Sequence, residues 1–160
     1  MRLIHLSNGS SAKVDDEDFE MLSHWSWSLC GKYAARKVKR GGKTRGIYMH
    51  RQIMLPDPDQ QVDHINGDRF DNRRRNLRLA TSSQNNINRH DLRADKTSRY
   101  RGVTWYKRCG CWDMQIRSAG ARRVHSYHQD EVDAALAYDV AALSLHGEFA
   151  KTNFLEPVCA

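Results

Sequence analysis

An acidic residue followed at once by a histidine is the feature of this sequence with the clearest chemistry: Asp63 and His64. The unperturbed pKa of histidine lies near neutrality, so a neutral His64 can take a proton from a water that attacks phosphorus. The charge that develops on the phosphate and on the departing 3′ oxygen calls for a cation. Asp63 and Asn85 offer hard oxygen ligands of the kind that Mg²⁺ and Mn²⁺ take. These residues predict the hydrolysis of a phosphodiester.

The elements that position these side chains can be inferred from the pattern of polar and apolar residues. Alternation over residues 61–65 and 76–79 predicts two strands, with an Asn-Gly turn signal between them. Ser82 or Thr81 can cap a short helix over roughly residues 83–89. The expected order is therefore strand, loop, strand and helix, with the acid-histidine pair near the end of the first strand.

In this order the segment resembles the HNH nuclease motif of phage homing and free-standing endonucleases, which has a ββα-metal fold. In that family an acid-histidine pair ends the first strand, an asparagine before leucine lies in the connecting loop, and a last histidine or asparagine lies on the helix. The resemblance implies that Asp63 and Asn85 bind a single divalent ion, Mg²⁺ or Mn²⁺, and that His64 is the general base. Asn76 then orients His64 or braces the loop. A shift of one residue, to Asn86, stays open for the last ligand.

A second histidine precedes this segment. HNH relatives carry a similar His-Arg pair at the head of a short helix, and here the pair is His50 and Arg51, in a helix that Pro56 would end. His50 could approach DNA or make internal contacts, and the internal role is favoured.

The charge of the chain favours a polyanionic partner. Lys and Arg number 26 against 19 Asp and Glu. A run of arginines, Arg73, Arg74 and Arg75, lies inside the candidate phosphate-cutting segment. Such a run often forms only a solvated face, but beside this site we expect contacts with DNA phosphates.

A second block runs from Ser98 to Phe154. Three strands are predicted over residues 100–106, 111–118 and 122–128. Asp130 is a candidate cap for an alanine-rich helix that extends to about His146, where Gly147 stops it. The buried face of this helix is expected to pack against one face of the sheet.

This block resembles the APETALA/ethylene-response-factor DNA-binding domain, through its Tyr-Arg-Gly-Val element, its Ala-Tyr-Asp element and its closing Asn-Phe pair. In that family the sheet lies in the major groove of DNA. The resemblance implies DNA contacts by Arg101, Arg117 and Arg122, and weaker ones by Trp105 and Tyr127. The chain departs from the plant domains where they have tryptophan and it has valine, at position 124. The base preference of the plant domains is therefore not transferred.

The expected fold class is α+β: a ββα-metal nuclease module followed by a three-stranded antiparallel sheet packed on one helix. The predicted segments are a leader over 1–47 that packs on the nuclease, an HNH core over 48–90, a linker over 91–97 and a DNA-binding domain over 98–154. The predicted function is a metal-dependent HNH DNA endonuclease, homing-type and phage-encoded. The alternative is a DNA-binding transcriptional regulator in which the HNH segment is a non-catalytic scaffold.

Several classes of protein do not fit the sequence. No apolar run is long enough for a membrane span, and the start lacks the pattern of a signal peptide. The four cysteines lack zinc-knuckle spacing, so no structural zinc is expected, and reduced thiols are the simplest account of them. The expected location is therefore a cytoplasm, that of a bacterial host if the gene is phage-encoded. The expected partner is double-stranded DNA, and the expected state is a monomer.

Overall fold

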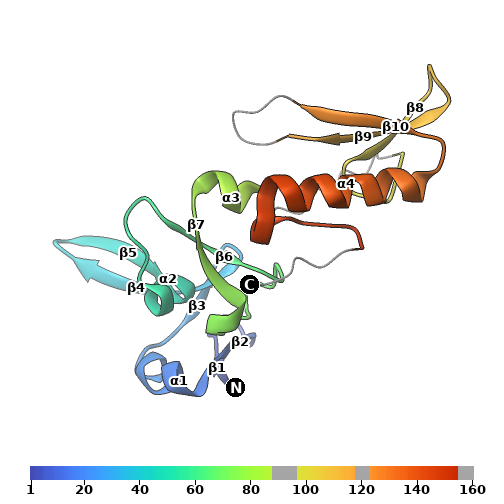
Figure 1. The fold of residues 1–160 in the computed structure, drawn as a ribbon. Helices are drawn as coiled ribbons and strands as arrows, with labels where there is room; N and C mark the ends of the chain where they lie inside the picture. The colour runs from blue at the N-terminus through green and yellow to red at the C-terminus, as the bar shows by residue number, and fades with distance from the viewer. Residues whose placement is uncertain (88–96, 118–122, 155–160) are drawn as a thin grey trace. The chain divides into compact units, whose positions relative to one another are not determined.

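The computed structural model describes residues 1–87, 97–117 and 123–154 (Figure 1). The chain divides into two compact units, residues 1–85 and residues 86–160. Both units combine antiparallel strands with few helices, so the expected mixture of helices and antiparallel strands is confirmed. No helix in these described ranges is long and apolar enough to span a membrane.

The first unit contains two hairpins, a three-stranded sheet and short helices. Strand pairs β1-β2 and β6-β7 and the sheet β3-β4-β5 are all antiparallel. Gly41 and Gly42 both have positive φ and close the β4-β5 hairpin. The bounds are β1 (Arg2–His5), β2 (Ser11–Val14), α1 (Asp16–Ser23), β3 (Ser28–Cys30), β4 (Tyr33–Arg40), β5 (Lys43–Tyr48), α2 (Met49–Met54), β6 (Gln61–His64), a 3₁₀ turn η1 (Arg74–Asn76), β7 (Leu77–Ala80) and α3 (Ser82–Ile87).

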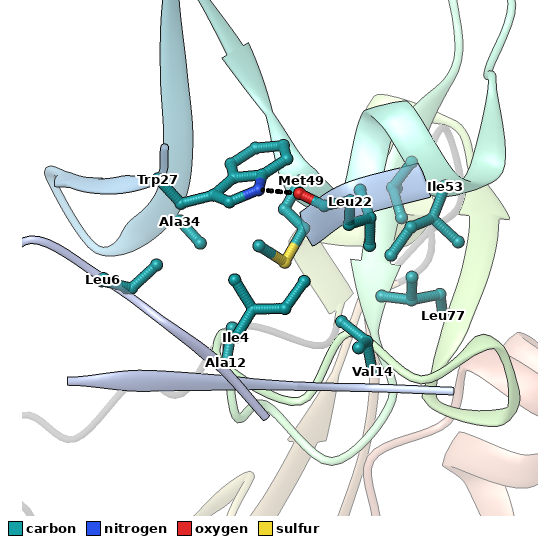
Figure 2. Packing of buried hydrophobic residues seen from close by; sticks show 11 residues of the cluster. Ile4, Leu6, Ala12, Val14, Leu22, Trp27, Ala34, Met49, Ile53 and Leu77 are labelled. Atoms are coloured by element: carbon teal, nitrogen blue, oxygen red, sulfur yellow. Dashed lines mark hydrogen bonds between the residues drawn. The ribbon is translucent and has the colours of Figure 1, made fainter. Parts of the chain in front are cut away.

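The core of this unit is built around one tryptophan. Trp27 is only 2% exposed, and its indole nitrogen donates to the carbonyl oxygen of Leu22 over 2.9 Å (Figure 2). Apolar residues from the strands and from α1 and α2 surround it, and Val62 and Leu77 bring β6 and β7 into the same cluster. Because both strands of the candidate site contribute to this core, burial of apolar surface holds their backbones in place.

The candidate site is carried by β6, β7 and α3. The two strands lie within one residue of their predicted bounds, and in the ladder Asp63 faces Arg78 and His64 faces Leu77. The Asn-Gly turn signal proves to open a longer loop, which returns to β7 through η1. Helix α3 begins at Ser82, one residue earlier than predicted, and residues 88 and 89 of the predicted helix lie outside the described residues.

The second unit has the predicted three strands and one helix, with the helix lying along the sheet (Figure 1). The first strand begins later than predicted, at Val103, because Gly102 has a φ of 72° that interrupts extended backbone. The predicted start of the third strand, Arg122, lies outside the described residues. The bounds are β8 (Val103–Tyr106), β9 (Cys111–Ile116), β10 (Val124–His128), α4 (Glu131–His146) and a 3₁₀ turn η2 (Gly147–Phe149).

Helix α4 begins and ends as predicted. The Asp130 side chain accepts from the backbone N–H groups of Val132 and Asp133, at 2.7 and 3.2 Å, which satisfies two of the unpaired donors of the first turn. Ala134, Ala135 and Ala142 are fully buried against the sheet, so the small side chains let helix and sheet approach closely, as the sequence predicts.

Candidate active site

His64 is the last residue of β6 and is almost completely buried, at 5% exposure. Its Nε2 lies 3.3 Å from Oδ1 of Asn72, in the loop that follows. Its ring centroid is 5.2 Å from that of His50 on α2 and 6.1 Å from that of Tyr33 on β4. The imidazole is therefore held on three sides, by an amide and two rings.

The surroundings of His64 favour its neutral form. Burial lowers its pKa below the usual value, while the Asn72 hydrogen bond and the charge of Asp63 act in the opposite direction, and the charge of Arg69 lowers it further. An amide oxygen can only accept a hydrogen bond, so the contact with Asn72 Oδ1 places the proton of the neutral ring on Nε2. The lone pair of this tautomer is on Nδ1.

Asp63 lies opposite Arg78 in the β6-β7 ladder, and the two side chains form a buried ion pair. Nε and Nη2 of Arg78 donate to the same carboxylate oxygen, Oδ2, over 2.9 and 2.8 Å. Asp63 is 5% exposed, so the positive charge offsets the cost of burying the carboxylate. The ion pair also sets the orientation of the carboxylate.

Asn85, on α3, is tied to the strand that carries Asp63. Its Nδ2 donates to Oε1 of Gln61 over 2.6 Å. Gln61 and Asp63 are two residues apart on β6, so they share one face of the strand. The hydrogen bond uses the amide nitrogen of Asn85 and leaves its oxygen as the atom suited to a cation.

Asn76 makes the contacts of a loop brace. Its Nδ2 donates to the backbone carbonyl of Asp71 over 2.7 Å, and its Oδ1 accepts from the backbone N–H of Asn66 over 3.0 Å. Its own carbonyl accepts from the N–H of Ile65. The side chain therefore joins both halves of the loop that connects β6 to β7. Of the two roles left open by the sequence, these hydrogen bonds support the second.

Two of the residues around His64 were not singled out from the sequence. Asn72 is 1% exposed, and its Nδ2 is buried without a hydrogen-bond partner in the described structure. Tyr33 packs against both histidines, at 5.1 Å from His50 and 6.1 Å from His64. Asn72 lies in a polar stretch that resembles an exposed turn, and Tyr33 lies far away along the sequence, so neither carried a local signal.

His50 lies in α2 as expected, and it is buried. Its ring stacks on Tyr48 at 5.6 Å and meets His64 edge-on. Burial lowers the pKa of His50 to about 3, and the nearby charges of His64 and Arg51 act in the same direction. The side chain thus belongs to the packing around His64.

The three arginines predicted to bind phosphates differ in whether they form ion pairs within the protein. Arg73 forms a bidentate ion pair with Asp71, which is 1% exposed, at 2.7 and 2.5 Å. Arg74 does the same with Asp18, which is 3% exposed, at 2.9 and 2.7 Å. Arg75 is exposed and pairs with no carboxylate in the described part of the chain. Two of the three charges are therefore already compensated by buried acids.

The predicted DNA contacts of the second unit also lie in different settings. Arg101 was expected on a strand, but it lies in the turn before β8, next to Gly102, whose positive φ does not fit extended backbone. Its Nε donates to the Tyr138 hydroxyl over 3.1 Å. Arg117 is exposed and directly follows β9. Arg122 lies outside the described residues.

The weaker candidates of this unit are both aromatic. Trp105 contacts Trp112 edge-on at 5.0 Å. Tyr127 is 53% exposed and stacks on Tyr106 at 5.7 Å. Of the two rings, Tyr127 is the more accessible to a partner.

Residues 55–87 match the family model described as HNH endonuclease. The match includes β6, β7 and α3 and therefore all four predicted HNH positions. The chain is also similar to an uncharacterized HNH endonuclease of Acanthamoeba polyphaga mimivirus, with 27% identity over 96% of this chain and 80% of that protein. Together the two matches support a nuclease of the HNH class.

The other relatives match a smaller part of the chain. The AP2-like ethylene-responsive transcription factor TOE2 of Arabidopsis thaliana is 40% identical over 38% of this chain, and APETALA2-like protein 2 of Oryza sativa subsp. indica is 39% identical over 37%. The matched regions span only 12% and 14% of these plant proteins. No solved structure gives a significant match.

Proposed function

We propose that this protein is a metal-dependent DNA endonuclease that hydrolyses phosphodiester bonds through His64. The observation that carries the proposal is the environment of His64. The imidazole is buried, burial lowers its pKa, and it lies next to an aspartate inside the segment that matches the HNH endonuclease family. A general base needs a positioned lone pair and a pKa that leaves it unprotonated, and both are consistent with these contacts.

In the proposed reaction His64 Nδ1 accepts a proton from the attacking water. The water oxygen forms the new bond to phosphorus, the bond from phosphorus to the 3′ oxygen breaks, and the leaving oxygen takes a proton from solvent. Asn72 holds the imidazole in the required tautomer through Nε2, and Asn76 keeps the loop that carries Asn72 closed. His50 and Tyr33 pack against two other sides of the ring and restrict its movement.

Asp63 and Asn85 are the proposed ligands of a divalent cation. A carboxylate oxygen and an amide oxygen form a hard donor set, which suits Mg²⁺ or Mn²⁺ better than zinc. The orientation of Asn85 fits this role, because its nitrogen is used by Gln61. When bound, the ion supplies positive charge that stabilises the phosphate and the leaving oxygen. Arg78 orients Asp63, in the way that outer partners orient metal ligands.

For the second unit we propose recognition of double-stranded DNA. The support is the similarity to a plant protein named as a transcription factor and the exposure of Arg117, which directly follows β9, and of Tyr127 on β10. Arg117 and Arg122 are the proposed contacts. Arg73, Arg74 and Arg101 already have internal partners, and we assign them to holding the loop and the turn in place.

The same proposal includes a homing-type, phage-encoded enzyme that acts as a monomer in the cytoplasm of a bacterial host. Its support is the resemblance of the motif spacing to phage endonucleases and the occurrence of a relative in a virus. The predicted division into a leader, an HNH core, a linker and a DNA-binding domain belongs to this proposal as well.

A transcriptional regulator with a non-catalytic HNH scaffold is the second candidate. The plant relatives favour it, and so does the ion pair in which Arg78 occupies one oxygen of Asp63. Supercoiled DNA incubated with the full-length protein distinguishes the two. We expect conversion to nicked or linear DNA with Mg²⁺ or Mn²⁺ and none in excess chelator. Tight binding with intact DNA under all these conditions would support the regulator.

A further inference from the structure

The arginines of the HNH segment differ in whether their charge is compensated. Arg73, Arg74 and Arg78 each form an ion pair with a carboxylate that is at most 5% exposed: Asp71, Asp18 and Asp63. Within the described ranges Arg69 has no such partner, and its side chain is exposed. Asp68 beside it is used elsewhere, by Lys13 and by the backbone N–H of Phe70. The positive charge of Arg69 is therefore available to an anion that approaches from solvent.

The position of Arg69 brings this charge to the candidate base. Its guanidinium carbon lies 5.5 Å from the ring centroid of Tyr33, and the Tyr33 ring packs against His64. Tyr33 therefore lies between the guanidinium and the imidazole as a shared packing partner. A phosphate placed for attack by a water on His64 would lie close to a cation that is held over an aromatic ring.

The backbone on both sides of Arg69 is held in place. The Asn66 side chain accepts from the N–H of Asp68 over 2.8 Å. Beyond Arg69, the carbonyl of Phe70 accepts from the N–H of Lys13 over 2.7 Å, and the N–H of Asn72 donates to the carbonyl of Lys13 over 2.8 Å. The loop is thus attached to β2, so the guanidinium extends from a fixed backbone. A preorganised donor stabilises developing charge without reorganisation during the reaction.

We propose that Arg69 is a catalytic residue that donates to a nonbridging oxygen of the scissile phosphate and stabilises the charge that develops there. The inference rests on the proposed nuclease function and adds a contact that involves no proton transfer by Arg69. His64 takes the proton of water, and Arg69 stays charged throughout. The two effects are distinct, because removing Arg69 leaves the base and the proposed metal ligands in place.

The test compares three full-length variants on one duplex substrate under single-turnover conditions. Arg69→Met keeps an apolar chain on Tyr33 and removes the charge, and Arg69→Lys keeps the charge without the guanidinium. Arg2→Met is the matched control, because Arg2 also lies over an aromatic ring, that of Phe19 at 3.7 Å, on the remote strand β1. Thermal unfolding of each variant shows whether the fold is kept.

We expect Arg69→Met to lower the cleavage rate at saturating protein about 10²- to 10³-fold, the loss typical of one charge-stabilising donor, and to change the DNA dissociation constant less than about 3-fold. Arg69→Lys should regain part of the rate, and Arg2→Met should match the wild type. Equal rates for Arg69→Met and wild type, or a loss confined to DNA affinity, would overturn the inference while the nuclease function stands. A wild-type protein that cuts nothing with Mg²⁺ or Mn²⁺ would overturn both.

Discussion

The motifs of the two units have different roles in the structure, although each motif resembles that of a known family. In the first unit the motif histidine, His64, is buried next to the motif acid Asp63 and contacts an amide and two rings that lie outside the four motif positions. In the second unit the three motif elements bind one another. Tyr138 packs on Gly102, where any side chain would clash with the tyrosine ring, and buried Asp139 accepts from the backbone N–H groups of Asn153 and Phe154.

This difference shows that one resemblance indicates a fold and the other indicates an activity. The Tyr-Arg-Gly, Ala-Tyr-Asp and Asn-Phe elements are accounted for by packing and hydrogen bonding inside the unit, so their presence indicates a fold. Among the HNH positions, Asn76 is accounted for by loop hydrogen bonds, but His64 is not. Burying an ionisable side chain is unfavourable for stability, and ionisable groups with perturbed pKa values cluster at functional sites. Similarity in the first unit therefore favours a chemistry, and similarity in the second favours a scaffold.

The largest expected effect is on the rate of cleavage. Changing His64 to Ala removes the proposed base and should lower the cleavage rate by roughly 10²- to 10⁴-fold. DNA affinity, measured in chelator, should change little. His24→Ala is the control, since His24 is exposed and its ring contacts only the backbone carbonyl of Glu20 in the described structure. If the His64 variant kept the wild-type rate and its thermal stability, the first unit would no longer differ from the second.

The next effect is on stability. Asp139 is fully buried and accepts the N–H of Asn153 and the Nδ2 of the same residue on Oδ1, and the N–H of Phe154 on Oδ2. Asp139→Ala leaves these donors unpaired and should lower the free energy of unfolding of the second unit by roughly 3 kcal/mol. Asp133→Ala, exposed in the first turn of α4, should cost less than about 1 kcal/mol. Chemical denaturation followed by circular dichroism measures both, and equal losses would argue against the internal role of the motif.

Local sequence rules were sufficient for the elements of both units and for part of the site. The capping aspartate and terminal glycine of α4, the Gly-Gly hairpin and the strands of the HNH segment follow from turn and capping chemistry, which acts over a few residues. The partners of the site come from far away in sequence. Arg74 meets Asp18, and His64 meets Tyr33, through tertiary packing that no local pattern records.

The arginine run also shows that local sequence does not predict the partners of a charged side chain. Three adjacent arginines have the same local chemistry, yet two of them meet buried acids and one does not. Arg101 was misplaced for a different reason, because the strand rule does not include the positive φ of the following glycine. The proposed base and ligands follow from residue chemistry and from the resemblance to the HNH motif, whereas the compensation of the surrounding charges has no signal in the local sequence.

A smaller effect is expected from pH. The folded pKa of His50, about 3, lies below the value near 6.5 of an unfolded histidine, so this residue contributes stability above pH 6.5. The contribution is lost as pH falls from about 6.5 toward 3, because the unfolded chain then binds a proton that the folded chain does not. The slope is up to about 1.4 kcal/mol per pH unit. His50→Phe should flatten the decline in the free energy of unfolding with falling pH. If the free energy of unfolding depended on pH in the same way for His50→Phe and for the wild type, His50 would not be the cause of the decline.

The smallest effect is on the salt dependence of DNA binding, and it separates neighbours in the arginine run. Arg75 is exposed and without a carboxylate partner in the described ranges, so a phosphate contact by Arg75 would release a counterion. Arg75→Ala should reduce the slope of log K against log salt by up to about 0.9. Arg74→Ala should leave this slope nearly unchanged and lower thermal stability instead, because it leaves Asp18 buried without its ion pair. Fluorescence anisotropy titrations over a range of salt concentrations, with thermal unfolding of the same samples, test both statements. Equal slopes for all three proteins would mean that Arg75 is solvated and makes no phosphate contact. A reduced slope for Arg74→Ala would mean that Arg74 leaves its ion pair with Asp18 to contact DNA.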